Sequence, residues 1–421
     1  MLNARKLKVA ALVDLIRSPQ SGGHVKGWER LALAAANSAL PLELTVFFSG
    51  SAQSEALAPH VTLQQLPQVF STARLKFLPY LPDHTDLARY HPALATALSG
   101  FDVVHTTDAY FAFTRTAERL CQQRQLGLTH SFHTDQPNYA RIFTRKAIRE
   151  TLGDGALSRL LLAKWQVPER AARRMELRRD RHLYQCDLVL ATRPSDQMRA
   201  EQILGPHGVR HLRLGADKTL FNPQRANRRA ICARYAIPAD RLIVVFVGRL
   251  DEGKNIHTLL DALQRLTSEG LPLHLVAAGI GPAAADIGRL LPHHSTVPGF
   301  ILPAELATLY ASADALALVS EVEIRSMAMV EGLACGLPVL VAEKSGLHQL
   351  FPATDAIQTV TGGAAAWSTA LRDFATTTLR QRMQTAAQSY ALQNIASWEQ
   401  VLAEDLLPAW QQAATMNHAR P

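Results

Sequence analysis

Short and almost uninterrupted apolar runs recur along the whole chain. Lys8–Asp14, Asp187–Thr192 and Leu242–Gly248 are examples, and none shows the regular alternation of a half-exposed strand. Such runs are typical of strands buried on both faces of a parallel sheet. Longer stretches with helical spacing of apolar residues, such as Ile256–Ser268, lie between them. This alternation of strand and helix predicts an α/β protein with doubly wound sheets.

The alternation forms two successive series, which predict an N-terminal domain over residues 1–215 and a C-terminal domain over residues 216–395. Further strands are expected at Leu42–Phe48, Phe101–His105, Leu128–Phe132, Leu273–Gly279, Val297–Phe300, Ala315–Val319 and Val339–Ala342. Further helices are expected at Trp28–Ala39, Pro303–Ser312 and Ala364–Leu392. The alanine-rich residues beyond Gln411 are expected to fray, as chain ends often do.

Composition narrows the class of protein. The chain has 421 residues, of which 48% are hydrophobic, enough for two or three domains with their own cores. No apolar run approaches the ~20 residues of a membrane-spanning helix. Met1–Lys8 leads directly into a strand without the apolar core of a signal peptide, so a cytoplasmic protein is expected. The four cysteines are scattered singly, which predicts neither a disulfide framework nor a zinc site.

The excess positive charge is local. Formal net charge is +8, and the segment from Arg141 to Arg181 carries twelve Lys or Arg against five Asp or Glu. Arginines recur there at three- and four-residue steps, at positions 170, 173, 174, 178 and 181, which places them on one helical face. This segment predicts contact with an anionic membrane surface, since no nucleic-acid-binding motif accompanies it. A solvated helix with internal pairs such as Glu169–Arg173 is the alternative.

Two carboxylates flank a predicted helix start in the C-terminal half. Glu323 and Glu331 are eight residues apart, Ser326 suits the N-cap between them, and Gly336 suits the left-handed position after the helix. We expect Glu323 in the loop before the helix and Glu331 on its inner face. Both would point into a cleft at the carboxyl edge of a parallel sheet, where open α/β folds bind ligands. Glu321 is an alternative to Glu323.

The stretch Glu323-x7-Glu331, followed by Gly336-Leu-Pro-Val, resembles the signature of retaining glycosyltransferases of the GT-B class, family 4, the glycosyl transferases group 1. Gly248-Arg-Leu-Asp-Glu-Gly-Lys254-Asn255 resembles the G-R-L-x-x-x-K-N phosphate motif of the same family. The resemblance implies two Rossmann-like doubly wound domains facing across a cleft, with residues 396–421 as a helix crossing back to the first domain. Ile324-Arg-Ser326 departs from the family's Ser/Thr-Phe-Gly, which bears on the identity of the donor.

The resemblance implies a role for each candidate donor-binding residue. Arg249 and Lys254 would stabilise the diphosphate, because transfer needs fixed cations at the leaving group. Glu331 would bind the ribose hydroxyls, and Glu323 would contact the donor sugar. Gly281, in Gly279-Ile-Gly-Pro282, would close the nucleobase pocket. No Asp-x-Asp occurs, so no metal is expected to be required, and the nucleotide sugar is a substrate rather than a permanent cofactor.

The N-terminal half contributes further candidates. Gly22 and Gly23 follow the first strand, where backbone N–H groups can approach a phosphate or a sugar. His133-Thr-Asp135-Gln-Pro-Asn-Tyr139 resembles the H-T-x-x-P-x-Y element of family members that act on lipid-linked or mannosyl acceptors. His133 would lie near donor sugar and acceptor, unless it is a core histidine bonded to a carbonyl. Asp135 could instead position the acceptor hydroxyl.

The resemblance implies a retaining transferase that moves a hexosyl group from a nucleotide-diphosphate sugar to a lipid or glycan hydroxyl. It would be cytoplasmic and peripheral on the inner face of the membrane. No residue matches a covalent nucleophile, so the resemblance implies the same-face substitution proposed for the family. A nucleotide-sugar 2-epimerase of the same fold and a degenerate sugar-nucleotide-binding protein are the alternatives.

Overall fold

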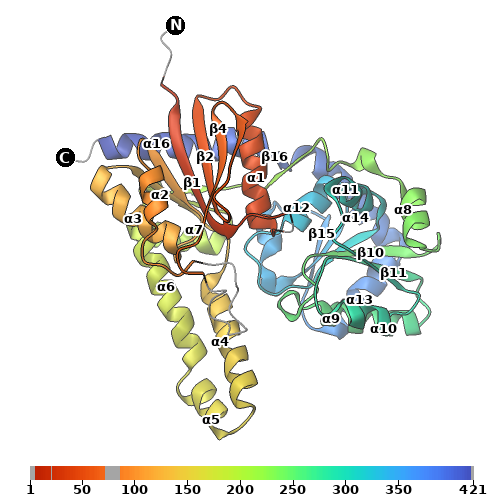
Figure 1. The fold of residues 1–421 in the computed structure, drawn as a ribbon. Coiled ribbons are helices and arrows are strands. Elements are labelled where there is room, and N and C mark those ends of the chain that lie inside the picture. The colour runs from red at the N-terminus through yellow and green to blue at the C-terminus, as the bar shows by residue number, and fades with distance from the viewer. Residues whose placement is uncertain (1–4, 20, 72–85, 419–421) are drawn as a thin grey trace. The chain divides into compact units, whose positions relative to one another are not determined.

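The computed structural model describes residues 5–19, 21–71 and 86–418. These residues form two compact units (Figure 1). Unit 1 comprises the described residues up to Arg213 together with those from Trp398 onward, and unit 2 runs from Leu214 to Ser397. Both units are α/β and contain parallel sheets flanked by helices, as the alternation of apolar runs and amphipathic stretches predicted.

Unit 1 is built on an eight-stranded sheet in the described part of the chain, in the order β3-β4-β2-β1-β5-β6-β7-β8. Its strands are β1 (Leu7–Ile16), β2 (Leu42–Ser49), β3 (Ser54–Ala58), β4 (Val61–Leu66), β5 (Val103–Thr106), β6 (Gly127–Ser131), β7 (Leu188–Ala191) and β8 (Val209–His211). All neighbours are parallel except the β3–β4 pair at one edge. That short antiparallel edge pair was not predicted.

Helices of unit 1 pack on this sheet or extend from it. They are α1 (Gly23–Ala36), α2 (Pro92–Ala97), α3 (Ala112–Arg124), α4 (Gln136–Leu152), α5 (Ala156–Arg159), α6 (Val167–Gln185), α7 (Pro194–Leu204), α15 (Trp398–Gln400) and α16 (Leu407–His418). Helices α4 and α6 pack against each other and, with α5 at their far end, form an arm that projects away from the sheet (Figure 1).

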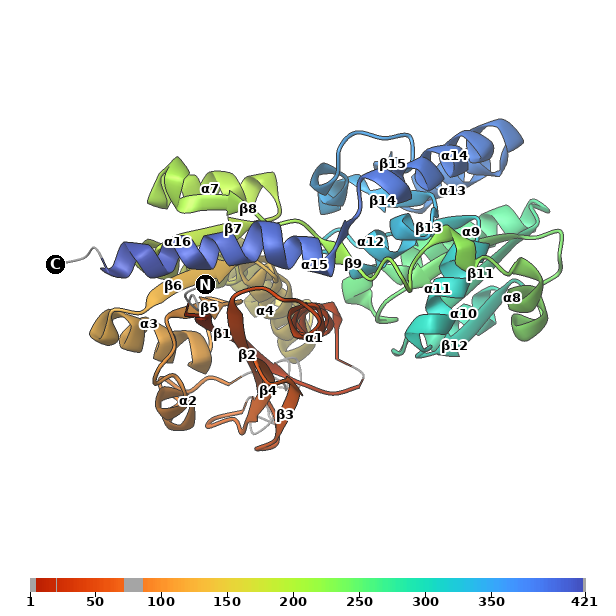
Figure 2. The ribbon, with the colours of Figure 1, turned by 90° about the horizontal axis from the view of Figure 1, so that it is seen from above.

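The C-terminal helix α16 lies against strands β5 and β6 (Figure 2). A Cβ on Gly127 would lie 3.1 Å from the backbone carbonyl carbon of Ala413, so a glycine here allows the helix to approach the strand closely. Trp410 and Ala413 are fully buried in this contact. The expectation that the chain frays beyond Gln411 is therefore wrong as far as His418, because packing stabilises the helix.

Unit 2 is built on a six-stranded parallel sheet, in the order β12-β11-β10-β13-β14-β15. Its strands are β10 (Leu242–Val247), β11 (Leu273–Ala278), β12 (Ser295–Gly299), β13 (Ala315–Leu318), β14 (Val339–Ala342) and β15 (Ile357–Val360), and β9 (Gly215–Ala216) pairs separately with β16 (Ala396–Ser397). Its helices are α8 (Arg228–Tyr235), α9 (Ile256–Ser268), α10 (Ala284–Leu290), α11 (Pro303–Ser312), α12 (Met327–Ala334), α13 (Ala364–Ala375) and α14 (Thr377–Gln393).

Strand β10 shows why its sequence is apolar throughout. Ile243 and Val245 belong to one buried cluster of unit 2, whereas Val244 and Phe246 belong to another. Successive side chains of a strand point to opposite faces, so both faces of this strand are covered. The predicted helix over 364–392 is broken at Thr376, whose extended backbone (ψ 136°) separates α13 from α14. Strand β15 was not predicted.

Asp14 in β1 is a fully buried carboxyl group of unit 1. It accepts hydrogen bonds from the Ser49 hydroxyl (2.7 Å) and the Phe113 amide (3.0 Å). Burial, and then the charge of Asp108, raise the pKa of Asp14 from 3.8 to about 8. Because the folded-state pKa is the higher one, protonation stabilises the fold fully below pH 3.8, and this contribution is lost as the pH rises through about 8.

The variant Asp14→Asn should remove this pH dependence, because the amide cannot ionise. Its oxygen can accept from the Phe113 amide, and its NH2 group can donate to the Ser49 hydroxyl oxygen. Between pH 3.8 and about 8, the unfolding free energy of the original protein should fall relative to that of the variant. The slope should reach up to about 1.4 kcal/mol per pH unit. Urea unfolding at several pH values measures the difference, and identical pH profiles would contradict the prediction.

Candidate functional site

The loop after strand β10 places Lys254 at the carboxyl edge of the unit 2 sheet. Gly248 leaves the strand with φ +150°, and the Asp251 carboxylate accepts a hydrogen bond from the Lys254 amide (3.1 Å). Asn255 follows in the left-handed conformation and donates from its side-chain amide to the Val319 carbonyl (3.2 Å). This bond ties the loop to the residue that follows strand β13.

Lys254 forms an ion pair with Glu323, and both side chains are largely buried, with 23% and 14% of their surfaces exposed. Glu323 lies in the loop before α12, as predicted from the capping pattern. Glu321 forms a different pair, with Lys344 at 3.2 Å, and both of those side chains are much more exposed. The structure therefore brings Glu323, and not Glu321, to Lys254. Lys254 and Glu323 are 69 residues apart in the sequence.

Helix α12 holds Glu331 and is capped as its sequence predicts. The Ser326 hydroxyl accepts from the Met329 amide (3.3 Å), and Gly336 follows the helix with φ +73°. Glu331 is partly buried on this helix. Burial, followed by the charge of Glu331, raises the pKa of Tyr310.

Arg249, the other predicted cation of the loop after β10, pairs with Asp251 (2.8 Å), and 61% of its side chain is exposed.

Gly281 has a packing role that its sequence context did not reveal. A Cβ at this position would lie 2.2 Å from the Leu250 carbonyl oxygen, and one on Gly279 would lie 1.8 Å from that of Gly248. The loops after β10 and β11 are thus in backbone contact, with the Leu250 amide donating to the Ile280 carbonyl (3.0 Å). This contact alone accounts for both glycines, and the nucleobase role of Gly281 stays a prediction.

Gly22 and Gly23 mark the start of helix α1 in unit 1. Gly22 is the N-cap residue with φ −69°, and it provides no side-chain cap. Neither its backbone angle nor the space around it requires glycine, since a Cβ would have no atom within 4 Å. Helix N-termini present N–H groups that lack intrahelical partners and favour anions. The two glycines leave this helix end accessible, and both are exposed.

His133 lies two residues beyond strand β6 and is held by aromatic and polar contacts. Its ring stacks on His24 of α1 at 4.2 Å between centroids, with an interplanar angle of 5°. Its Nε2 lies 2.7 Å from the Ser131 hydroxyl oxygen, which lies 2.8 Å from Nε2 of His105. On the other side of His105, the Trp410 indole N–H donates to Nδ1 (3.2 Å). Nε2 of His133 therefore contacts a hydroxyl oxygen.

This chain of bonds indicates which nitrogen of His133 carries the proton. An indole N–H can only donate, and the Thr129 hydroxyl, whose oxygen lies 2.8 Å from the same Nδ1, can act as a donor too. We therefore infer that Nδ1 of His105 is an acceptor and that its proton is on Nε2. That N–H donates to Ser131, whose own O–H then meets Nε2 of His133. His133 is therefore inferred to be protonated on Nδ1. Neither Ser131 nor Trp410 was expected to belong to the site.

Ring nitrogen NMR can test the tautomer of His133. In the original protein Nε2 should show the shift of an unprotonated acceptor and Nδ1 that of a protonated nitrogen. Ser131→Ala removes the donor to Nε2, so the two tautomers of His133 should then exchange. Ser99→Ala is a matched control, since its hydroxyl is exposed and donates to the Thr96 carbonyl. An Nε2-protonated His133 in the original protein would contradict the inference.

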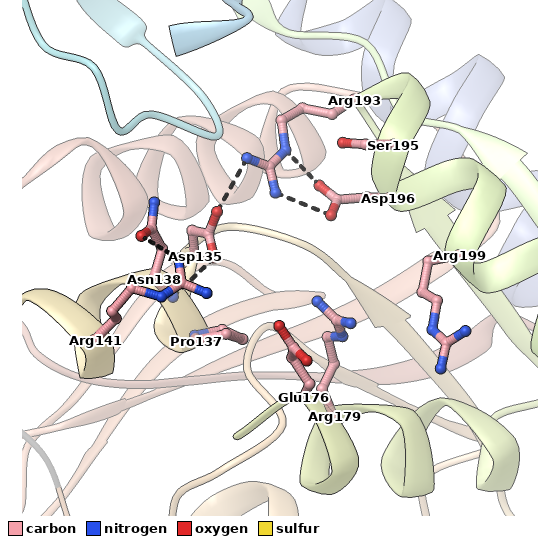
Figure 3. Close-up of a pocket in the computed structure, with 10 residues that line it drawn as sticks. All are labelled: Asp135, Pro137, Asn138, Arg141, Glu176, Arg179, Arg193, Ser195, Asp196 and Arg199. Carbon is pink, nitrogen blue, oxygen red and sulfur yellow. Dashed lines mark hydrogen bonds and ion pairs between the residues drawn. The ribbon is translucent and has the colours of Figure 1, made fainter. Parts of the chain in front are cut away.

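Asp135 is the N-cap residue of helix α4 and forms an ion pair with an arginine. Its carboxylate accepts from the Asn138 amide (3.2 Å) and pairs with Arg193 (3.3 Å). It also lines a pocket of about 330 Å³ in unit 1 (Figure 3). Sequence reasoning missed Arg193, although its position just after strand β7 could have indicated a site at the carboxyl edge of the sheet.

Within the described ranges, no group of three or more His, Cys, Asp or Glu side chains is placed to hold a metal ion. Over the same residues, no helix is both long enough and apolar enough to cross a bilayer.

Comparison with known protein families identifies part of unit 2. Residues 227–390 match the family model Glycosyl transferases group 1. This segment contains Lys254, Glu323 and Glu331, the residues that carried the resemblance in the sequence. The predicted resemblance to that family is confirmed for this segment.

Two curated relatives are similar to parts of this chain. A GDP-mannose-dependent alpha-(1-6)-phosphatidylinositol dimannoside mannosyltransferase of Mycobacterium tuberculosis is 36% identical over 148 residues, 33% of this chain and 37% of the relative. A D-inositol 3-phosphate glycosyltransferase of Rhodococcus erythropolis is 27% identical over 275 residues, 62% of this chain and 61% of the relative. The chain thus spans less than two thirds of the length of either relative.

Among solved structures, sucrose-phosphate synthase from Thermosynechococcus elongatus has a TM-score of 0.69 at 19% identity. The alignment covers 98% of this chain and 99% of that one. At this identity the likeness shows the fold alone. The fold is GT-B, with two Rossmann-like doubly wound domains, as the sequence predicted.

Proposed function

We propose that the protein is a retaining glycosyltransferase of family 4, which moves a hexosyl group from a nucleotide-diphosphate sugar to a lipid or glycan hydroxyl. The observation that carries this proposal is the Lys254–Glu323 pair at the carboxyl edge of the unit 2 sheet, inside the segment that matches the family model. The names of the two relatives support a nucleotide-sugar donor and a lipid or phosphorylated acceptor.

In this proposal Lys254 meets the diphosphate of the donor. An ammonium group has three N–H donors, so Lys254 can keep Glu323 and still bond to a phosphate oxygen. Arg249 is exposed and reaches the same diphosphate from the start of the loop. Fixed cations at this place stabilise the negative charge that develops on the leaving group, and no metal is then required. Glu331 binds the ribose hydroxyls, and Gly281 closes the nucleobase pocket.

The chemical step is a substitution at the anomeric carbon. The bond from that carbon to the diphosphate oxygen breaks, and a bond from the acceptor oxygen forms on the same face. Because the new bond forms on the face that the leaving group departs from, the configuration is retained. The proton of the acceptor hydroxyl passes to the departing phosphate oxygen. Glu323 stabilises positive charge at the anomeric carbon, and His133 and Asp135 position the reacting groups. Gly22 and Gly23 contribute backbone N–H groups from the start of α1.

The test is incubation with UDP-, GDP- and ADP-sugars, with and without a lipid acceptor, in buffer with and without a chelator. Release of nucleotide that depends on the acceptor, with an α-linked product from an α-linked donor, supports the proposal. Release without any acceptor would favour the 2-epimerase alternative. Donor binding without release would favour a sugar-nucleotide-binding protein. Loss of activity in the chelator would contradict the metal-independent step.

We further propose that the arm of unit 1 docks on an anionic membrane, as a peripheral contact of a cytoplasmic enzyme. Exposed apolar side chains gather at its tip, namely Leu152, Leu157 and Trp165. Exposed basic side chains accompany them, namely Arg149, Arg159, Lys164, Arg170, Arg173 and Arg174. We call these nine residues the arm surface. Apolar and basic residues together are typical of helices that lie at a bilayer interface.

The ion pairs of the arm change one expectation. Arg178 was expected on the basic face, but it forms two hydrogen bonds of 2.8 Å with Glu118 on α3 and faces inward. The pair Glu169–Arg173, expected if the helix were simply solvated, is replaced by Glu169–Arg145 at 3.0 Å. Arg173 is left exposed on the arm surface.

Removing three cations should weaken membrane binding strongly. Each cation near an anionic bilayer contributes about 1 kcal/mol, so Arg170, Arg173 and Arg174 changed to Gln should lower the affinity about a hundredfold. Cosedimentation with phosphatidylserine-containing vesicles at low and high salt measures this. The control changes Arg225, Arg229 and Arg265 of unit 2 to Gln, an equal loss of charge. Equal losses in both variants, or binding that ignores salt, would rule out the arm surface.

A further inference from the structure

The pocket of unit 1 is formed by three helices at the carboxyl edge of its sheet (Figure 3). Helices α4 and α7 both begin there, and α6 passes alongside. Its lining consists of Asp135, Pro137, Asn138, Arg141, Glu176, Arg179, Arg193, Ser195, Asp196 and Arg199. We call this the arginine pocket, because four arginines face three carboxylates in it.

Arg193 forms ion pairs with two of those carboxylates. It forms two bonds with Asp196, of 2.7 and 2.9 Å, and one with Asp135 of 3.3 Å. Only 17% of the Arg193 side chain is exposed, so the group is a fixed wall of the pocket. Both carboxylates also lie at the starts of helices, where negative charge is favourable. This part of the lining is already well bonded, and with one arginine and two aspartates it carries a formal net charge of −1.

The other three arginines have fewer acceptors. Arg179 and Arg199 share one carboxylate, that of Asp180, at 3.2 and 2.5 Å, and Arg199 also donates to the amide oxygen of Gln202 (3.0 Å). Arg141 donates to the neutral amide oxygen of Asn138 (3.1 Å). Each guanidinium carries five N–H donors in a planar fork that suits the oxygens of a phosphate. The pocket therefore presents more hydrogen-bond donors than its own side chains can use.

The helix starts add a favourable electrostatic potential for an anion. The N-terminus of an α-helix carries partial positive charge, and α4 and α7 both direct theirs toward the pocket. Glu176 is the third carboxylate of the lining. A carboxylate beside an anion site favours a ligand that also carries hydroxyl groups, because a hydroxyl can donate to it.

We propose that the arginine pocket binds the phosphate group of a hydroxyl-bearing acceptor. That the ligand is an acceptor rests on the proposed glycosyltransferase function, whereas the phosphate site itself does not. Arg141, Arg179 and Arg199 hold the phosphate oxygens, and Arg193 keeps Asp135 and Asp196 from repelling them. The phosphate belongs either to a lipid headgroup or to a soluble sugar phosphate.

Titration calorimetry with inorganic phosphate tests the site without any turnover. Binding to the original protein should weaken about tenfold or more in Arg179→Gln/Arg199→Gln, since two charge-assisted donors are lost. Arg181→Gln is the matched control, being an exposed arginine of the same helix outside the lining, and its affinity should be unchanged. Arg141→Gln leaves the Asp180 pairs intact and should also weaken binding, which covers the case of a double variant that fails to fold.

The donor site must be distinguished from this one. Phosphate affinity that falls in Lys254→Ala and stays constant in the pocket variants would overturn the inference, as would equal affinity in all proteins. Phosphate binding lost only in the pocket variants, together with no turnover of any nucleotide sugar, would uphold the phosphate site and refute the proposed function.

Two further probes identify the source of the phosphate. Glucose 6-phosphate represents a soluble ester, and phosphatidylcholine vesicles with and without phosphatidic acid represent a headgroup. If the pocket variants lose affinity for glucose 6-phosphate alone, the acceptor is soluble. If they lose affinity for phosphatidic acid vesicles while the arm surface is intact, the acceptor is a lipid. Variants that lose neither probe would overturn the inference.

Discussion

Lys254→Ala should lower turnover by a factor of about a hundred to a thousand. Removing one fixed electrostatic donor from such a site costs roughly 2.7–4 kcal/mol of transition-state stabilisation. The effect should fall mainly on kcat, because the charge on the leaving group grows as the glycosidic bond breaks. Steady-state kinetics with the best donor of the panel measures it.

The control for this variant is Lys344→Ala. Lys344 also pairs with a glutamate of the same loop, Glu321, but 69% of its side chain is exposed. Exposed pairs of this kind contribute little, so activity and stability should both be kept. Circular dichroism and the unfolding midpoint show whether Lys254→Ala keeps its fold. A folded Lys254→Ala enzyme with unimpaired turnover would refute the assignment of the diphosphate site.

Glu323→Gln should reduce kcat by a comparable factor while donor binding is nearly kept. The carboxylate stabilises positive charge that exists only as the sugar departs, so its loss is felt in the transition state. Its partner Lys254 remains, and the amide fills the same space in a site where the carboxylate is 14% exposed. Single-turnover rates and donor titration separate the two quantities.

Two other glutamates calibrate this result. Glu321→Gln should have little effect, because Glu321 pairs with Lys344 at the surface. Glu331→Ala should instead raise the dissociation constant of the donor, since the ribose is bound equally in the ground state and in the transition state. A rate defect in Glu321→Gln without one in Glu323→Gln would show that the catalytic carboxylate lies two residues earlier.

Local features of the protein were predictable from short stretches of sequence. Ser326 caps α12 and Gly336 follows it in the left-handed conformation, as their side chains and spacing indicate. The apolar run of β10 predicted a strand buried on both faces. These features depend on bonds and steric limits within a few residues, or on solvent exclusion along a single strand.

Short edge strands and long-range docking were harder to predict. Strand β15 has only four residues, and its pattern does not distinguish it from a loop. The alanine-rich end of the chain has little apolar character of its own, yet α16 is held by close approach to Gly127. Whether such a segment is ordered depends on the surface that it meets, and its own composition does not show that surface.

The sequence by itself determined the class of fold and predicted that Lys254, Glu323 and Glu331 lie at the carboxyl edge of a parallel sheet. Only the tertiary structure paired Lys254 with Glu323 and not Glu321, and linked Trp410 through His105 and Ser131 to His133. It also gathered the arginine pocket from three separate helices. The physical reason is that side-chain partners 69 or 305 residues apart are set by sheet order and helix packing. Capping and hydrophobic patterns act over a few turns and carry no information about those distances.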